Sequence, residues 1–448
     1  MTILWTDGLI YLLVIFVTVI CVFISQKPQF KRPLQKISSS KTGMVSLLIL
    51  VFFVVIGLLD SIHFKSTENR THEIISLLDY WAKPLRLQSE KTYSSPFSAY
   101  LYSKETITLE NGKTEWGYPR LKYGGVHLND PDNELSRDVL YKASIGFIRG
   151  ATLVLLFTVL LWSFYHDRDK AIFKSAVSKT VWLTLFLLVS ISYMLIYLSS
   201  YYHVLGTDKV GEDVFYQAVK SIRTGLVIGS LTTMIMLPLA IVFGIMAGFF
   251  RGWVDDVIQY VYTTLNSIPG VLLIAASILM VQVYMSNHAE DFNSLIVRSD
   301  MRLLFLCLIL GVTSWTGLCR MLRAETLKLR EMEYVQAAQA LGVKQSTILI
   351  RHILPNVMHI VLISVVLDFS ALVLAEAVLS YINIGVDPTT YSWGNMINGA
   401  RLEMAREPVV WWSLMASFVF MFSLVLAANL FADTVRNAFD PRRAEQGA

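Results

Sequence analysis

Residues 323–356 read RAETLKLREMEYVQAAQALGVKQSTILIRHILPN, and this polar stretch lies between two long apolar runs. Its part from Glu333 to Leu341 is rich in alanine, the residue with the highest helix propensity, and predicts a helix. Gly342 predicts the end of that helix, because glycine adopts the left-handed conformation at little cost. A second helix is expected over 346–353, and Pro355, which lacks a backbone donor, is expected to stop it and to mark the entry to the next apolar run.

The apolar runs on either side belong to a chain that is hydrophobic along most of its length. Of its 448 residues, 54% are hydrophobic and 16% are charged, whereas soluble domains carry about 25% charged residues. A membrane-spanning helix needs about 20 mostly apolar residues. Nine runs meet that requirement, at 8–25, 43–60, 147–165, 180–199, 224–249, 268–285, 303–321, 357–379 and 411–432. The sequence therefore predicts an all-α polytopic membrane protein.

Positive charge collects in the connections on one side of this nine-helix arrangement. Lysine and arginine are abundant at 26–43, 166–179 and 322–356 and in the C-terminal tail. Short loops rich in these residues stay in the cytoplasm. An external N-terminus and a cytoplasmic C-terminus are therefore expected. The run 8–25 lacks a basic leader and a small-residue cleavage site, so we interpret it as a retained helix rather than a signal peptide.

Residues 61–146 then form one external region, which is polar and rich in turn-forming residues. Within it, Thr106 to Leu109 alternates in the manner of a strand, and Asn111-Gly112 follows as a hairpin turn. We expect a small, loop-rich external insertion here.

The sequence carries no pattern typical of an enzyme. The stretch 111–114 contains Gly-Lys-Thr, but a phosphate-binding loop also needs glycine where this chain has Ile107. Cys21, Cys307 and Cys319 lie in apolar runs without a CxxC pair, and no two histidines are spaced i, i+4, so no metal site is expected. The basic residues form no single patch, so nucleic acid is not expected as a partner. If ATP drives this protein, the ATPase is another chain, and no cofactor is expected in this one.

Small side chains at Ala337, Ala338 and Gly342 predict a shallow patch on the helix pair of 323–356. Such a patch can seat in the groove of a partner, with polar contacts from Arg330, Arg351 and His352 at its edge. The alternative, on spacing alone, is a hairpin that only orders the loop.

The same stretch carries the pattern Gln336-Ala337-Ala338-x-x-x-Gly342, followed by Arg351-His352-Ile353-Leu354-Pro355-Asn356. It resembles the EAA loop of ABC-importer permeases, and the RHxLPN ending is typical of the dipeptide/oligopeptide/nickel subfamily. That family usually has glutamate where this chain has Gln336, and Glu333 stands one turn earlier. The resemblance implies that this segment, Tyr334 included, is the coupling loop that docks on an ATPase subunit.

The likeness continues in order along the second half of the chain. Its further parts are His203-Val204-Leu205-Gly206-Thr207-Asp208-Lys209-Val210-Gly211-Glu212-Asp213, Gly248-Phe249-Phe250-Arg251-Gly252-Trp253-Val254-Asp255, Ile268-Pro269, Leu374-Ala375-Glu376-Ala377-x-Leu379-Ser380-Tyr381, Ser392-Trp393-Gly394 and the tail from Asn429 to Arg442. The family has proline at the position of Val204 and arginine at that of Glu212. The Asp-Pro-Arg ending is similar to that of the C-type subunit of the permease pair.

This resemblance implies a six-helix permease core that works by alternating access. The implied partners are a second, B-type permease subunit, two ATP-binding-cassette subunits that hold ATP and magnesium, a periplasmic solute-binding protein, and the lipid bilayer. The implied substrate is a peptide, because no histidine or methionine cluster suggests the handling of nickel.

The front of the chain departs from the family pattern, with about three extra helices. The expected regions are N-terminal membrane helices with a basic loop at 1–60, the external insertion at 61–146, an extra membrane hairpin at 147–200, the permease core at 201–442 and a cytoplasmic tail at 443–448. Either 43–60 or 180–199 is the first core helix, since both keep the sidedness of the core.

Four polar residues in or beside the expected spans are candidates for the translocation path. Asp368 and Glu376 lie in the eighth run, where a carboxylate is costly unless it faces a cavity or a protein partner. They either favour the amino group of a peptide or hold the helix packing. Asn266 and Ser267 either face the path or cap a helix at the interface.

Two hypotheses from other classes remain at this point. An ion-gradient-driven secondary transporter would need discontinuous helices in inverted repeats, which are not evident, and would leave the 323–356 segment without a role. A membrane scaffold without transport activity is the other.

Overall fold

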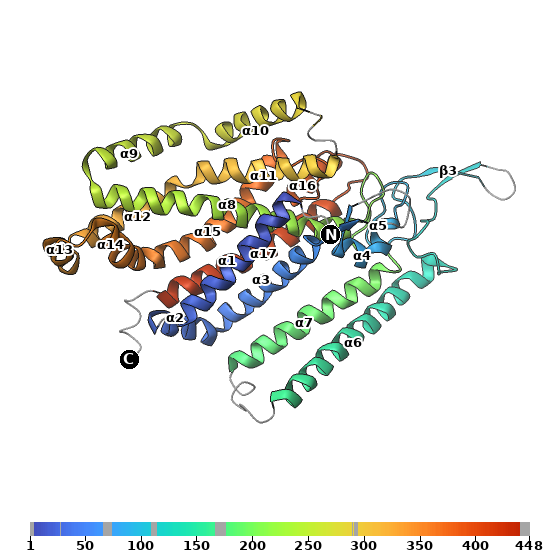
Figure 1. The fold of residues 1–448 in the computed structure, drawn as a ribbon. Helices are drawn as coiled ribbons and strands as arrows, with labels where there is room; N and C mark the ends of the chain where they lie inside the picture. The colour runs from blue at the N-terminus through green and yellow to red at the C-terminus, as the bar shows by residue number, and fades with distance from the viewer. Residues whose placement is uncertain are drawn as a thin grey trace. The chain divides into compact units, whose positions relative to one another are not determined.

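The computed structural model describes residues 4–26, 28–65, 74–108, 114–165, 176–288, 290 and 294–439 (Figure 1). The chain divides into two compact units that alternate along the sequence. The first consists mainly of 38–223 and 391–427, and the second of 3–37, 224–390 and 428–448. Because these ranges interleave, two long helices contribute residues to both units: α8 (Val214–Phe250) and α17 (Trp412–Phe439).

The first unit combines membrane helices with the external insertion. Besides its parts of α8 and α17 it contains α3 (Lys41–Asp60), β1 (His63–Lys65), β2 (Ile74–Ser76), α4 (Leu77–Trp81), α5 (Lys83–Leu87), β3 (Glu105–Thr108), β4 (Thr114–Gly117), α6 (Pro131–Tyr165), α7 (Ala176–Ser199) and α16 (Trp393–Glu403). The strands form two antiparallel hairpins, β1–β2 and β3–β4. The predicted strand at Thr106 is confirmed in β3, and the predicted Asn111-Gly112 turn lies outside the described residues.

The second unit holds most of the helices expected for the permease core. Besides its parts of α8 and α17 it contains α1 (Trp5–Gln26), most of α2 (Pro28–Ser39), α9 (Gly252–Ser267), α10 (Gly270–Asn287), α11 (Leu295–Ser314), α12 (Thr316–Arg330), α13 (Glu333–Ala340), α14 (Gln345–Ile348), the π-helical turn η2 (Leu349–Ile353) and α15 (Leu354–Tyr381). The basic segment after the first run is thus mostly helical, in α2. The basic residues at 166–175 and those after Phe439 lie outside the described residues.

The predicted all-α membrane fold is confirmed. Seven helical segments in the described part of the chain are long and apolar enough to cross a membrane. They overlap all the predicted runs except two: 8–25, which is helical in α1, and 303–321, which lies in α11 and α12. The first half of α11 carries Arg298, Asp300 and Arg302, which make it more polar than an ordinary span.

Several predicted boundaries are wrong. The run 303–321 is not one helix, because the helical hydrogen bonding is interrupted at Trp315, between α11 and α12. The helices α6 and α8 begin at Pro131 and Val214, well before the predicted spans at 147 and 224. Hydropathy marks where a helix becomes apolar, not where its backbone hydrogen bonds begin. The end of the predicted loop-rich insertion is therefore the first part of α6.

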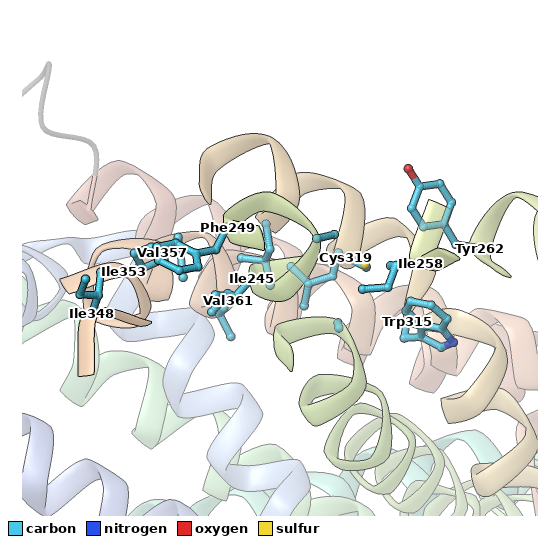
Figure 2. Packing of buried hydrophobic residues seen from close by; sticks show 14 of the residues in the cluster. Ile245, Phe249, Ile258, Tyr262, Trp315, Cys319, Ile348, Ile353, Val357 and Val361 are labelled. Carbon is cyan, nitrogen blue, oxygen red and sulfur yellow. The ribbon is translucent and has the colours of Figure 1, made fainter. Parts of the chain in front are cut away.

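Close helix packing forms the core of the second unit. A Cβ atom at Gly244 of α8 would lie 2.8 Å from the carbonyl oxygen of Cys319, and one at Gly248 would lie 2.7 Å from that of Arg323. Two glycines four residues apart thus let α8 approach α12 directly, as small residues do between membrane helices. The apolar cluster around this contact includes Trp315 and continues toward the 323–356 segment (Figure 2).

The additional N-terminal helix is attached to the second unit by a buried polar contact. The backbone N–H and the hydroxyl of Thr6, in α1, both donate to the carboxylate of Asp300 in α11. Both residues are 5% exposed or less. The hydrogen bonds from Thr6 therefore replace those that water would make to the buried carboxylate. This contact explains why α11 can bury an acidic residue.

Candidate functional site

The 323–356 segment forms a compact helical hairpin from α13, α14 and η2, which lies at the ends of α12 and α15 (Figure 1). Val335 and Ala338 of α13 are buried in the same apolar cluster as Ile348 and Ile353 of the second arm. Figure 2 shows Ile348 and Ile353 at one end of this cluster. Full burial of an aliphatic side chain contributes about 1.5–3 kcal/mol. The hairpin is therefore a packed extension of the membrane core rather than a solvated loop.

Gly342 ends the first arm, as predicted. Its φ is +72°, and its N–H donates to the carbonyl of Gln339 at 3.0 Å, while the N–H of Val343 donates to that of Ala338 at 3.1 Å. A Cβ atom at Gly342 would meet no atom within 4 Å. Glycine is thus required here for its left-handed backbone and not for space.

The exposed surface of the hairpin differs from the predicted patch. Ala337 and Gly342 are exposed, but Ala338 is 8% exposed and packs inward, so the patch of three small residues does not exist. The helical period explains this, because adjacent residues in a helix point in directions about 100° apart. The outer surface instead presents Leu341 at 83% exposure and Ile350 at 66%. An exposed leucine at the tip of a rigid hairpin is suited to insertion into a partner.

Pro355 marks the entry to the next apolar run, as predicted, but it does not interrupt the helical chain. The helical chain runs on from α14 through η2 into α15, with Pro355 in the first turn of α15. A proline in a regular α-helix collides with the carbonyl four residues before it, and a π-helical turn is wider. The turn at Leu349–Ile353 thus lets the helix pass the proline, and Leu354 remains half-buried beside it.

Polar side chains tie the two arms together. The amide of Asn356 donates to the hydroxyl of Tyr334 at 3.1 Å and to the carbonyl of His352 at 2.6 Å. The rings of Tyr334 and His352 lie 6.2 Å apart. Arg351 is exposed, and Glu333 opens α13, where a carboxylate is favourable because the helix dipole is positive at that end.

Two arginines of α12, the helix that leads into the hairpin, bond to the corner between α8 and α9, around Arg251. Arg323 of α12 donates two hydrogen bonds to Asp255, at 2.6 and 2.7 Å, and these bonds hold the pKa of that carboxyl below its usual range. Arg330 donates to the carbonyl of Phe249 at 2.8 Å and so caps the end of α8. Arg330 thus contacts the α8 side of the corner, and Arg323 contacts the α9 side.

A third connection runs in the opposite direction, from the corner to the hairpin. The guanidinium of Arg251 lies 2.5 Å from the carboxylate of Glu331, which stands between α12 and α13. The side-chain amide of Gln336 donates to the carbonyl of Glu331 at 3.3 Å and approaches its carboxylate at 3.5 Å. The residue that departs from the family pattern therefore makes a contact within this chain.

The candidate path residues have different surroundings. Glu376 is 1% exposed and accepts a hydrogen bond from Ser380 at 2.7 Å, within α15. Asp368 is half-buried, in the middle of the membrane helix α15. Asn266 accepts a hydrogen bond from Thr316 at 3.2 Å, and Ser267 donates to the carbonyl of Thr263 at 2.8 Å. Both end α9 and are exposed in the chain by itself.

The external motif of residues 203–213 lies in the first unit, between α7 and α8. The hydroxyl of Thr207 accepts a hydrogen bond from the N–H of Ser94 at 2.7 Å and donates to the carbonyl of Thr92 at 2.8 Å. Asp208 accepts hydrogen bonds from two N–H groups of its own turn. Backbone bonds to the external insertion complete this contact, so the motif and the insertion form one packed structure.

The two glycines of the motif have positive φ and lie against the insertion backbone. A Cβ atom at Gly206 (φ +72°) would lie 2.4 Å from the carbonyl oxygen of Ser94. One at Gly211 (φ +79°) would lie 1.9 Å from that of Glu90. Both glycines are therefore needed for backbone conformation and for space.

His203 and Asp213 bring a buried charge into this contact. Nδ1 of His203 lies 2.7 Å from Asp213, and Nε2 lies 3.5 Å from Glu90 of the insertion, with all three side chains at most 3% exposed. Burial disfavours charge on the imidazole, but the two carboxylates outweigh burial and raise the pKa of His203 to about 9. Asp213 also accepts the N–H of Tyr216 at 3.0 Å and so caps α8.

The remaining external motif residues begin α16. The indole N–H of Trp393 donates to the carbonyl of Ala218 at 3.0 Å, and the side chain is 1% exposed. Gly394 is buried in the same turn, which Ser392 caps by accepting the N–H of Asn395 at 3.0 Å. The motif thus packs on α8 within the first unit.

The acidic residues that complete these contacts were not predicted from the sequence. Glu90 accepts N–H groups from Lys122 and Tyr123 as well as facing His203. Lys220 of α8 forms ion pairs with Asp60 and Asp79. No motif surrounds these acidic residues, so their role follows only from the folded arrangement. In the residues that the structure describes, no group of three metal-ligating side chains could hold a metal ion.

Comparison with known proteins finds relatives of the second half of the chain. The sequence model of the family described as binding-protein-dependent transport system inner membrane component matches residues 240–445. The chain is 31% identical over 239 residues to the oligopeptide transport system permease protein of Mycobacterium tuberculosis, which covers 53% of this chain and 76% of that protein. It is 28% identical over 240 residues to the glutathione transport system permease protein of Pectobacterium atrosepticum, covering 54% and 73%.

A third relative shows how much of the chain lies outside the shared region. Identity with the dipeptide transport system permease protein of Lactococcus lactis is 30% over 243 residues, or 54% of this chain and 65% of that protein. The predicted resemblance is confirmed by these matches, and the 240–445 match contains the whole α13–α14 hairpin. The chain therefore belongs to the family of binding-protein-dependent transport system inner membrane components, as a multi-pass permease subunit.

Proposed function

We propose that this chain is the C-type permease subunit of an ATP-driven peptide importer in a bacterial inner membrane. It forms half of the translocation path with a B-type permease subunit, and a periplasmic solute-binding protein delivers the substrate. Two ATP-binding-cassette subunits hold ATP and magnesium on the cytoplasmic side. The N-terminus lies in the periplasm and the C-terminus in the cytoplasm. The printed names of the relatives, which are permeases for dipeptides, oligopeptides and glutathione, support a peptide as the substrate.

The observation that carries this proposal is the α13–α14 hairpin. Its inner face is packed and its stem is fixed by arginines, so it moves with the ends of the membrane helices. On its outer face, Leu341 and Ile350 are exposed and available for contact with an ATP-binding-cassette subunit. A rigid element with an apolar tip can transmit the closure of a nucleotide-bound partner, because that partner then contacts the hairpin differently in its two states.

For the path, the surroundings favour different roles for the two carboxylates. The hydrogen bond from Ser380 supports a packing role for Glu376. Asp368 is the stronger candidate to attract the amino group of a peptide, because a half-buried carboxylate in a membrane helix is costly unless it faces a cavity or a partner. Asn266 and Ser267, at the exposed end of α9, remain candidates beside it.

The decisive experiment replaces Leu341 by aspartate in the full assembly. A leucine buried in an interface contributes about 1.5–3 kcal/mol, so its replacement by a charge is expected to lower ATPase co-purification by about tenfold or more. Uptake of a mixed pool of isotope-labelled di- to pentapeptides into proteoliposomes, measured with and without ATP, is expected to fall in parallel. The matched control is Leu295→Asp, a change at another exposed leucine, on α11.

Two outcomes would contradict the proposal. Peptide uptake by the chain without ATP or ATPase subunits would indicate a secondary transporter. Equal co-purification of the ATPases with wild type and Leu341→Asp would show that the hairpin tip is not the docking surface.

A further inference from the structure

The corner between α8 and α9 holds a non-glycine residue in a strained backbone conformation. Arg251 has φ +54° and ψ −171°, a region that is essentially restricted to glycine. Gly252, the next residue, also has a positive φ, of +59°. Such a conformation persists only where the surroundings maintain it.

The contacts around it come from α12 and from the start of α13. The guanidinium of Arg251 pairs with Glu331, and Gln336 of α13 donates to the backbone carbonyl of Glu331. On the two sides of the corner, Arg330 bonds to Phe249 and Arg323 to Asp255. The strained residue is therefore flanked by two contacts from α12 and itself contacts the start of α13.

We propose that Arg251 is a positioning residue that couples movement of the α13–α14 hairpin to the direction of α9. The side chain of Arg251 links Glu331, at the base of the hairpin, to a backbone position that is free to relax once that link is lost. A displacement of the hairpin that separates Glu331 from Arg251 lets the corner relax, and α9 begins at the very next residue. This inference rests on the proposed function, because it assigns a transmission route to the same hairpin.

Glutamine at position 336 fits this arrangement. Its amide nitrogen lies 3.5 Å from the carboxylate of Glu331, so a glutamate there would place a second negative charge beside the first. That charge would compete with Glu331 for Arg251. The neutral side chain of Gln336 does not compete, so Arg251 pairs with Glu331 alone.

The test uses three changes in the complete assembly of both permease subunits, two ATPases and the binding protein. Arg251→Gly fits the corner without strain and removes the ion pair. Arg251→Glu combined with Glu331→Arg reverses the pair and restores it, whereas Arg251→Glu alone places two carboxylates together. Lys328→Ala is the matched control, since Lys328 pairs with Glu325 in the same helix but does not contact the corner.

The measured quantity is the uptake of the mixed labelled peptide pool per ATP hydrolysed in proteoliposomes. We expect Arg251→Gly and Arg251→Glu to lower this ratio about tenfold while ATP hydrolysis continues. We expect the reversed pair to recover most of the loss and Lys328→Ala to match wild type. The thermal unfolding midpoint of Arg251→Gly is expected not to fall, because glycine relieves the backbone strain.

Three results would overturn the inference while leaving the proposed function intact. These are an unchanged ratio for Arg251→Gly, an equal defect in the single and the reversed variants, or a loss of uptake that only follows a lowered unfolding midpoint. An absence of ATP-dependent uptake in the wild-type assembly would instead contradict the proposed function itself.

Discussion

His203 shows how one buried side chain joins two segments that are distant in the sequence. Its ring lies between Asp213, which caps α8, and Glu90 of the external insertion. A buried imidazole is stable in its charged form only where carboxylates surround it, and both are present here. The charge therefore binds the insertion to the start of α8 more firmly than a neutral contact would.

This arrangement predicts how stability depends on pH. The pKa of His203 is raised from 6.5 to about 9, so its contribution is complete below 6.5 and is lost as pH rises through about 9. The loss is expected to be on the order of 3 kcal/mol. Thermal unfolding of the purified chain between about pH 7 and about pH 10 should show a falling midpoint for wild type and a smaller fall for His203→Gln. His288→Gln, a change at an exposed histidine, is the control, and equal slopes in all three proteins would contradict the prediction.

At the scale of elements, both units contain pairs of helices that approach closely at glycines. Gly244 and Gly248 let α8 approach α12, and Gly146 and Gly150 let α6 approach α7. A Cβ atom at Gly150 would lie 2.7 Å from the Cα of Ser190. Small residues four apart on one face allow this close contact, which van der Waals attraction stabilises in a membrane. The additional α6–α7 pair is therefore a defined helical hairpin (Figure 1).

Substitution of Gly150 by leucine is expected to force α6 and α7 apart. The added side chain meets the backbone of α7, which cannot yield as a flexible side chain could, so a loss of about 1–3 kcal/mol in stability is expected. The thermal unfolding midpoint in detergent measures it. Thr152→Leu places the same side chain on the exposed face of α6 and is expected to leave the midpoint unchanged. A similar midpoint for both variants would show that the two helices are not in close contact.

At the scale of the whole molecule, each unit combines a part shared with the family and a part that is additional. In the first unit, the insertion packs on the 203–213 motif and reaches the last helix, since the indole of Trp412 donates to the carbonyl of Thr207 at 2.9 Å. In the second, α1 bonds to α11 through Thr6 and Asp300. The additions are thus packed on the units and are not separate domains joined by linkers.

The proposed orientation predicts which residues a reagent can reach from each side of the membrane. Ser103 lies in the insertion and Ser346 in the hairpin, and both are exposed. With Cys21 replaced by serine, and with Cys307 and Cys319 buried, single Ser103→Cys and Ser346→Cys changes report sidedness. A membrane-impermeant maleimide should label Ser103→Cys in intact cells and Ser346→Cys only after permeabilisation, because positive loops stay inside. The reverse pattern would place the hairpin outside and exclude ATPase docking.

The sequence alone determined the all-α membrane fold class, the left-handed turn at Gly342 and membership of the family. These properties depend on local composition, on backbone preference and on short motifs whose residues are adjacent in the chain. They are therefore readable without knowledge of the fold.

The tertiary structure alone decided which residues of those motifs face a partner and which face the core. It turned Ala338 inward and left Leu341 exposed, paired His203 with Glu90, and held Arg251 in a glycine-like conformation against Glu331. Each of these features depends on contacts between residues that are far apart in the sequence or lie on different helices. The free energy of such contacts depends on burial and distance, and both exist only once the helices are packed.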